Sequence, residues 1–199
     1  MRHPVAFAAS VAAIAGAIAL LVGGCGSAVV PSIVPSTSPA PTGVASSAVA
    51  VDESLIQRLP VSVGGIVLTS DPATAADIAT DPSLAGSASA IAVAFAISPG
   101  ASGDDEVAVA SVVQLRDGVF DDDFYRSWRD SYDTAACESA GGVSGNAEAD
   151  IGSRHAYIGT CAGGAHTYHV YLEDEGIIVS VTSVGEQRLG EQIVAGLRD

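Results

Sequence analysis

The sequence predicts an α+β fold with a mainly antiparallel sheet, one long central helix, a C-terminal helix and short N-terminal helices. Three observations lead to this class. Valine-rich apolar runs of strand length occur in neighbouring stretches that only short turns separate. Between and after these groups, apolar residues recur at helical spacing. Strands joined by short turns, with helices between the groups, are typical of α+β proteins with antiparallel sheets.

The first part of the expected domain contains two Asp-Pro pairs, which begin at Asp71 and Asp81. Aspartate is a favourable helix cap and proline suits the first helical position, so one or two short helices are expected within residues 71–85. A short helical turn and a strand are expected before them, at residues 54–59 and 66–70.

Two nearly continuous apolar runs follow, at residues 90–98 and 106–116, with a turn rich in glycine between them. Their length, valine content and flanking turn residues predict two antiparallel strands. Because polar residues do not alternate regularly along these runs, we expect both faces of the strands to be covered, as in the middle of a sheet.

The best-specified helix is expected at residues 121–136. Asp121 suits the N-cap, and Phe120 and Tyr125 stand at the two positions of a hydrophobic staple. An apolar stripe with helical spacing follows. We expect it to pack on the sheet as part of the core. The alternative is that it lines the wall of a ligand groove. The stripe consists of Phe124, Trp128, Tyr132 and Ala135.

The C-terminal part predicts a run of strands and a closing helix at residues 185–197. The strands are expected at residues 147–151, 154–161, 166–172 and 177–183. Within the last two strands, alternate apolar residues fall on one face. The apolar stripe of the closing helix is formed by Leu189, Ile193, Val194 and Leu197.

The chain starts with a short basic stretch and a long apolar run that ends in Leu20-Leu21-Val22-Gly23-Gly24-Cys25. Such an order is typical of an export signal. The last residues resemble the lipobox of bacterial lipoproteins. That resemblance implies removal of residues 1–24 as a signal peptide, a diacylglycerol thioether on Cys25, and acylation of the new amino terminus with a fatty acid such as palmitate. An uncleaved membrane anchor is the alternative, since about 20 apolar residues can span a bilayer.

This prediction divides the chain into a signal peptide, a lipidated cysteine with a Ser/Pro/Ala-rich linker at residues 25–51, and one domain at residues 52–199. The linker is expected because its composition cannot build a core. The predicted location is the extracytoplasmic face of a cell membrane, through the lipid on Cys25, because two or more acyl chains hold a protein stably at a bilayer.

The charge balance disfavours nucleic acid as a partner. The formal net charge is −15 at pH 7, and all eight basic residues are arginines. Nucleic acid and anionic lipid headgroups would be repelled, whereas a cationic partner or divalent ions would be favoured. The lack of lysine also excludes Schiff-base chemistry on lysine and a P-loop.

The cysteines fit export to an oxidising compartment. With Cys25 set aside for lipid, one pair remains, Cys137 and Cys161. In such a compartment the pair predicts a disulfide, which would join the end of the central helix to a strand. A thiol nucleophile or a metal site is the alternative, disfavoured because no Cys-x-x-Cys motif is present.

Two groups of residues resemble a set of uncharacterised lipoproteins of high-GC bacteria. The first is Leu59-Pro60-x-x-Val63-Gly64-Gly65-x-x-Leu68, and the second is Tyr168-x-x-Tyr171 followed by the apolar alternation Ile177, Val179 and Val181 and by the closing helix. The resemblance covers most of residues 59–197. It implies a shared fold and export route, and it brings no activity with it.

No catalytic or metal-binding constellation emerges from the motifs, and no cofactor is expected. His166 and His169 would point to opposite faces of one strand, and His155 stands apart from them. The stretch Gly142-Val143-Ser144-Gly145-Asn146 departs from the Gly-x-Ser-x-Gly elbow of hydrolases. Three acidic clusters lack EF-hand spacing but could hold calcium through oxygen ligands. They are 104–106, 121–123 and 173–175.

These observations predict a membrane-tethered extracytoplasmic domain that binds a protein or small ligand without catalysis. An exported hydrolase that uses carboxylates or a histidine is the first alternative. A calcium-stabilised structural module is the second. The sequence leaves open the ligand and the oligomeric state.

Overall fold

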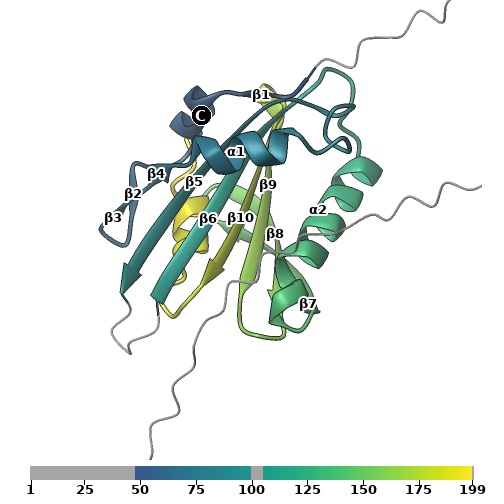
Figure 1. Ribbon diagram of the computed structural model, residues 1–199. Coiled ribbons are helices and arrows are strands. Elements are labelled where there is room, and N and C mark those ends of the chain that lie inside the picture. Colours follow the sequence, from purple (N-terminus) through teal and green to yellow (C-terminus); the bar gives the residue numbers. More distant parts are fainter. Residues whose placement is uncertain (1–47, 100–104, 199) are drawn as a thin grey trace, which may run out of the picture. The chain divides into compact units, whose positions relative to one another are not determined.

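The structure of the protein, a computed structural model, describes residues 48–99 and 105–198 (Figure 1). The predicted signal peptide and Cys25 lie outside these residues. The described part contains helices and a mostly antiparallel sheet, so the predicted α+β class is confirmed.

One sheet dominates the fold, with the strand order β1-β5-β6-β10-β9-β8-β7 and with β4 also paired to β5 (Figure 1). All neighbouring strands in it are antiparallel except β1 and β5. Its strands are β1 (Ala50–Val51), β4 (Thr69–Ser70), β5 (Ala88–Pro99), β6 (Asp105–Leu115), β7 (Val143–Ile151), β8 (Arg154–Cys161), β9 (His166–Leu172) and β10 (Ile177–Val184). A separate hairpin is formed by β2 (Ser62–Val63) and β3 (Ile66–Val67).

Three α-helices accompany the sheet: α1 (Pro72–Ala79), α2 (Asp122–Cys137) and α3 (Leu189–Ala195). Three short 3-10 helices are η1 (Glu53–Arg58), η2 (Glu138–Ala140) and η3 (Glu173–Glu175). The helix expected within residues 71–85 ends at Ala79, because Asp81 accepts a hydrogen bond from the Ser83 N–H and turns the chain toward β5. The closing helix starts later than expected, because Gly185 and Arg188 have positive φ angles of 114° and 55°.

The first face of the sheet is closed by α3, η1 and the β2–β3 hairpin. The predicted stripe on α3 is buried and packs on alternate residues of the central strands, among them Ile177, Val179 and Val181. Small residues of β5 and β6, such as Ala94 and Ala110, let these layers approach closely. The result is a continuous apolar core on this side.

Four described residues, 48–51, come before the expected domain boundary at residue 52. Val49 is buried, and Ala50 and Val51 pair with Ala90 and Ile91 of β5. The sequence reasoning placed these residues in the linker because they follow an uncharged, low-complexity stretch. In the structure residues 50 and 51 extend the sheet through their backbones, and both of their side chains are exposed.

The predicted cysteine pair is joined in the structure. A disulfide connects Cys137, at the end of α2, to Cys161, at the end of β8, with a Cα–Cα distance of 5.1 Å. Both residues are buried together with Ala165. The bond therefore fixes the C-terminal end of α2 to the sheet.

Candidate functional site

The second face of the sheet carries α1 and α2, and the local sequence explains how α2 is set there. Asp121 caps the helix by accepting a hydrogen bond from the Phe124 N–H at 2.7 Å. The rings of Phe120 and Tyr125 form the predicted staple, with centroids 5.6 Å apart. Phe120 also stacks on Tyr171 of β9, at a centroid distance of 3.5 Å. The start of α2 is thus held to the sheet, as its end is held by the disulfide.

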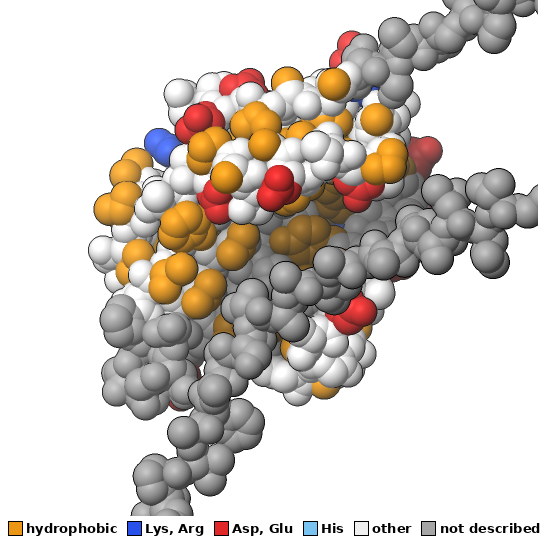
Figure 2. Space-filling model, viewed as in Figure 1, with side chains coloured by type: hydrophobic (Ala, Val, Ile, Leu, Met, Phe, Trp, Pro, Cys, Tyr) orange, Lys and Arg blue, Asp and Glu red, His pale blue; other side chains and the backbone are white. Residues whose placement is uncertain are grey.

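A groove of about 460 Å³ lies between α1 and α2, which we call the α1–α2 groove. Its floor is formed by β5 and β6 through Ile91, Val93, Val109, Ser111 and Val113. The wall contributed by α2 consists mainly of Phe124, Trp128, Tyr132 and Ala135. Figure 2 shows apolar side chains in a hollow beside α1 and over the neighbouring strands.

The apolar stripe of α2 therefore has both expected roles. Phe124 and Trp128 are partly buried and pack against the apolar cluster on this face, and the stripe also lines the groove. The reason is where the helices sit on the sheet. The long helix packs mainly on β7, β8 and β9, whereas α1 packs on β1 and β5. The two helices leave a gap above β5 and β6, and the stripe faces that gap.

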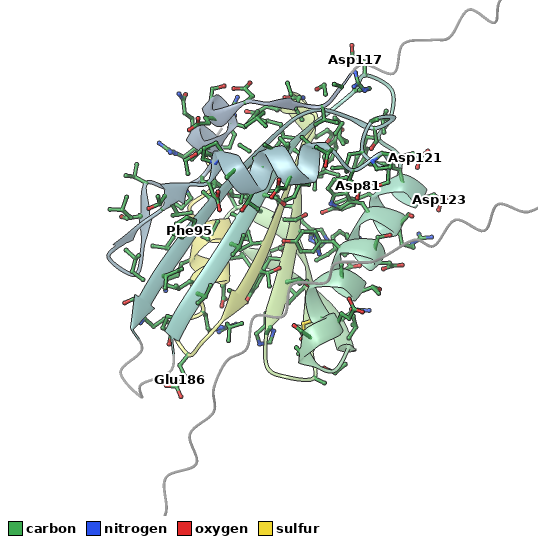
Figure 3. All side chains as sticks on the ribbon, in the orientation of Figure 1. Asp81, Phe95, Asp117, Asp121, Asp123 and Glu186 are labelled. Atoms are coloured by element: carbon green, nitrogen blue, oxygen red, sulfur yellow. A yellow bond between two sulfur atoms is a disulfide. The ribbon has the colours of Figure 1, made fainter. Side chains whose placement is uncertain are left out.

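The floor of the groove continues beyond the helices as an exposed apolar strip. Alternation along β5 places Phe95 and Ile97 on the same face as Val93, and their partners on β6 are Val109 and Val107. Ile97 remains 54% exposed. The expectation that both faces of these strands are covered is therefore correct only near α1 and α2. Phe95 lies along this strip, and Asp81, at the groove, lies toward the start of α2 (Figure 3).

A chain of hydrogen bonds, the α2 relay, runs beneath the helix. Trp128 Nε1–H donates to Ser180 Oγ at 3.2 Å, and Ser180 Oγ lies 3.0 Å from His169 Nδ1. His169 Nε2 lies 2.8 Å from Asp133 Oδ1. One proton arrangement satisfies the chain: Ser180 donates to Nδ1 and Nε2–H donates to the carboxylate. The single tryptophan of the groove wall is thus positioned by buried groups of β9 and β10.

Asp133 is held as a carboxylate. Burial raises its pKa, but hydrogen bonds from His169 and Thr167 outweigh that effect, and the pKa falls below its ordinary value. The space for this carboxylate depends on Gly159 of β8. A Cβ at that position would lie 2.5 Å from Asp133 Oδ2 and 2.3 Å from Thr167 Oγ1.

The residue types of the relay are those of a serine hydrolase, but the surroundings differ. Ser180 and His169 are fully buried, and Trp128 already donates a hydrogen bond to the serine oxygen. Nucleophilic catalysis needs a serine that a substrate can reach. In the described arrangement the relay joins α2 to the sheet, and the serine oxygen is not accessible to a substrate.

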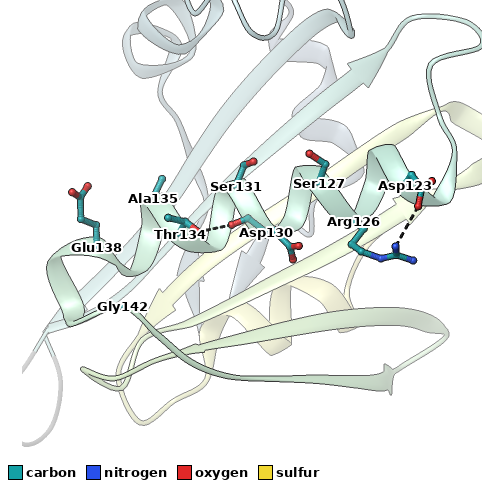
Figure 4. A pocket seen from close by; sticks show the side chains of 9 residues that line it. All are labelled: Asp123, Arg126, Ser127, Asp130, Ser131, Thr134, Ala135, Glu138 and Gly142. Carbon is teal, nitrogen blue, oxygen red and sulfur yellow. Dashed lines mark hydrogen bonds and ion pairs between the residues drawn. The ribbon is translucent and has the colours of Figure 1, made fainter.

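A second, polar cavity lies along the other edge of α2, next to β7 and β8. Its volume is about 470 Å³, and we call it the Arg129 pocket. Its lining comprises Arg126, Arg129, Asp130, Asp133, Asn146, Ala147, Glu148, Tyr157, Ile158 and His169. Figure 4 shows Ser127 and Ser131, which also line the groove, on one edge of α2. The side chains of Arg126 and Asp130 lie on the opposite edge (Figure 4).

The predicted histidines are dispersed. His169 belongs to the α2 relay, and His166 points to the opposite face, as expected from strand alternation. His155 is exposed, with Nδ1 3.2 Å from Asp150 Oδ1.

The acidic clusters have structural partners where they are described. Glu106 accepts hydrogen bonds from the Glu186 and Gln187 N–H groups, Asp121 caps α2, and Glu175 pairs with Arg58 at 2.8 Å. Within residues 48–99 and 105–198, no group of three His, Cys, Asp or Glu side chains is arranged to hold a metal ion. Calcium binding stays a prediction.

Sequence reasoning missed Asp133, Ser180, Arg129 and Tyr157 as members of sites. A usable signal existed for the relay. Thr167 and His169, and likewise Ser180 and Thr182, are polar residues at alternate positions of otherwise apolar strands. Buried polar groups need partners, so these positions indicate a polar layer under whatever covers that face.

Comparisons with protein-family models, curated proteins and solved structures gave no significant match. The resemblance to uncharacterised lipoproteins therefore stays a prediction. None of the described helices has the length and apolar character needed to cross a membrane.

Proposed function

We propose that the protein is an extracytoplasmic binding protein that takes an elongated apolar ligand, of the kind an acyl chain represents, in the α1–α2 groove. In this proposal the long central helix α2 forms one wall of the site, while the shorter helices complete it. The observation that carries the proposal is the stripe Phe124, Trp128 and Tyr132, which is only partly buried and lines a cavity above an apolar floor.

The chemistry of the lining supports a ligand that is mostly hydrocarbon. Hydrophobic and aromatic side chains form the floor and one wall, and the polar groups are mainly hydroxyls, such as Thr74, Ser127 and Ser131. Ligand sites of this size are typically apolar with few polar groups that orient the ligand. The exposed strip along Phe95 and Ile97 offers further apolar surface next to the groove.

The proposal includes the tether predicted from the sequence. Lipidation of Cys25 would hold the domain at the outer face of a cell membrane, and the linker would let it stand clear of the headgroups. The disulfide is compatible with such an oxidising compartment. A domain tethered there would meet apolar molecules at the bilayer surface.

Trp128 provides a direct test, because it is the single tryptophan of the chain. The full-length Cys25→Ser chain, which lacks the lipid acceptor, is titrated with palmitate below its micelle concentration while tryptophan emission is recorded. We expect a saturable change in emission, because the ligand would contact the indole ring. Lack of a saturable change contradicts the proposal.

A matched pair of variants locates the binding. Ala135→Phe fills the groove and is expected to weaken binding at least tenfold. Thr134→Phe adds the same ring on the outer face of α2, which Figure 4 shows, and should leave binding unchanged. Equal loss in both variants would show that the ligand binds elsewhere.

An exported hydrolase remains the second candidate, because Asp133, His169 and Ser180 lie in hydrogen-bonding sequence. Catalysis would require Trp128 to leave Ser180 and expose its oxygen. A fluorophosphonate probe followed by peptide mass analysis tests this directly. Labelling of Ser180 that Asp133→Asn abolishes would establish the hydrolase, and an unlabelled Ser180 would leave the relay a structural device.

A further inference from the structure

The guanidinium of Arg129 is held firmly but is left without an acceptor. Its central carbon lies 3.6 Å from the centroid of the Tyr157 ring and 5.1 Å from that of Tyr125. Its Nε is buried and has no hydrogen-bond partner. Stacking on an aromatic ring fixes the plane of a guanidinium without using its N–H groups. The donors of Arg129 are therefore oriented in advance.

The pocket that Arg129 lines also presents carboxylates. Asp130 and Glu148 line it from α2 and from β7, and the Glu148 side chain is 59% exposed. Arg126, the other cation of the lining, is already paired with Asp123 at 3.2 Å. Among the residues that the structure describes, Arg129 makes no hydrogen bond or ion pair, although its charge helps to lower the pKa of Asp133. Glu148 lies 3.6 Å from His155 Nε2 at the exposed side of the cavity. Positive and negative groups therefore face the same cavity without a direct hydrogen bond between Arg129 and a carboxylate.

This arrangement favours a ligand with both charges over a simple ion. A carboxylate matches the fork of a guanidinium in two parallel hydrogen bonds. An anion alone would be repelled by Asp130, Glu148 and the buried carboxylate of Asp133. An ammonium group alone would leave Arg129 without an acceptor and would be repelled by it. A molecule that carries both groups meets each opposite charge.

We propose that the Arg129 pocket binds a small zwitterion with the chemistry of a free amino acid. Its carboxylate is held by Arg129, and its ammonium group faces Glu148 and Asp130. A cavity of about 470 Å³ can hold such a molecule. The pocket lies on the edge of α2 opposite the α1–α2 groove. Binding of a zwitterion there can therefore be tested independently of the proposed apolar ligand.

The test compares four probes on the full-length Cys25→Ser chain by isothermal titration calorimetry at low ionic strength. Glycine and β-alanine carry both charges at different separations, acetate carries only the negative charge, and ethylammonium only the positive one. We expect at least one zwitterion to bind at least tenfold more tightly than acetate and ethylammonium. Equal affinity for acetate or for ethylammonium, or the absence of saturable binding by both zwitterions, overturns the proposal.

Variants test which residue binds each charged group of the zwitterion. Arg129→Gln should weaken zwitterion binding at least tenfold, and Arg129→Lys should restore only part of it, since an ammonium lacks the planar fork. Arg188→Gln removes the same charge from an exposed site beside α3 and should have no effect. Glu148→Gln changes an exposed side chain, so the fold should tolerate it, and it should weaken the zwitterion while leaving acetate unweakened. Equal affinities in Arg129→Gln and Arg188→Gln, or an unchanged affinity in Glu148→Gln, contradict the assignment.

Discussion

The two faces of the sheet are built from the same strands but are covered in different ways. The face under α3 is closed by apolar side chains, with Ile177 and Val179 of β10 against Ile193. The other face places Ser180 of β10 and His169 of β9 beneath α2, and it leaves cavities on both edges of that helix. The face under α3 is closed by one large apolar cluster, whereas the other, open face combines a smaller apolar cluster with the cavities in which we propose that ligands bind. The comparison yields four tests, from the largest expected effect to the smallest.

The first test removes equal amounts of side chain from the two faces. Ile193→Ala, in the closed core, should lower the free energy of unfolding by about 4 kcal/mol, because it leaves a cavity. Ile97→Ala, on the exposed strip, should lower it by less than about 1 kcal/mol. Urea denaturation followed by circular dichroism measures both. Similar losses would mean that the strip is covered in solution.

The second test releases the disulfide that fixes α2 to the open face. Cys137→Ser with Cys161→Ser should cost about 3.5 kcal/mol, because the bond closes a loop of about 25 residues in the unfolded chain. The same denaturation measurement applies. Reduction of the native chain should reproduce the loss, whereas reduction of the double variant should change nothing.

The third test disturbs the polar layer of the open face. Gly159→Ala should cost about 2 kcal/mol, since its Cβ would collide with Asp133 and Thr167. Gly145→Ala is the matched control, because a Cβ on that strand glycine meets no atom within 4 Å. A loss confined to Gly159→Ala supports the relay geometry. If both substitutions are equally mild, Asp133 does not occupy the described position.

The fourth test concerns the buried carboxylate of Asp133, which lies on the open face beneath α2. Because hydrogen bonds hold the folded-state pKa of Asp133 below its ordinary value of 3.8, the unfolded chain takes up the proton first as the pH falls. Its contribution to stability is complete above about pH 5 and is lost as the pH falls through the folded-state pKa.

Unfolding free energies measured between pH 6 and pH 3 check this. The unfolding free energy of the Asp133→Asn variant should fall less steeply over that range than that of the native chain. Some dependence of the unfolding free energy on pH will remain, since hydrogen bonds also lower the pKa values of the helix caps Asp52 and Asp71 and of the turn residue Asp81. An unaltered slope would contradict the role of Asp133.

The sequence predicted the closed face better than the open one, for a physical reason. Helical spacing places Leu189, Ile193 and Val194 on one stripe, and a stripe of that kind has one common use, which is packing. The stripe that contains Trp128 has the same spacing, but its environment depends on where α1 ends and on which strands α2 covers. Both depend on the tertiary arrangement, which the local spacing of apolar residues does not predict.

The candidate sites show the same limit. The disulfide was predictable, because only Cys137 and Cys161 remained once Cys25 was set aside. By contrast, Arg129 and Tyr157 are 28 positions apart in the sequence, and no motif links them. The cavity they share arises only when β8 comes to lie beside α2.

The attachment of α2 at both ends distinguishes the two helical walls of the α1–α2 groove. The stack of Phe120 on Tyr171 holds the start of α2 to the sheet, and the disulfide from Cys137 to Cys161 holds its end. The opposing helix α1 is eight residues long and contains no aromatic residue or cysteine, so it has no equivalent of these two attachments. For the proposed ligand, the expected route of entry is displacement of α1 from β5. A cross-link engineered between α1 and β5 would then slow entry while leaving the lining residues of the groove unchanged.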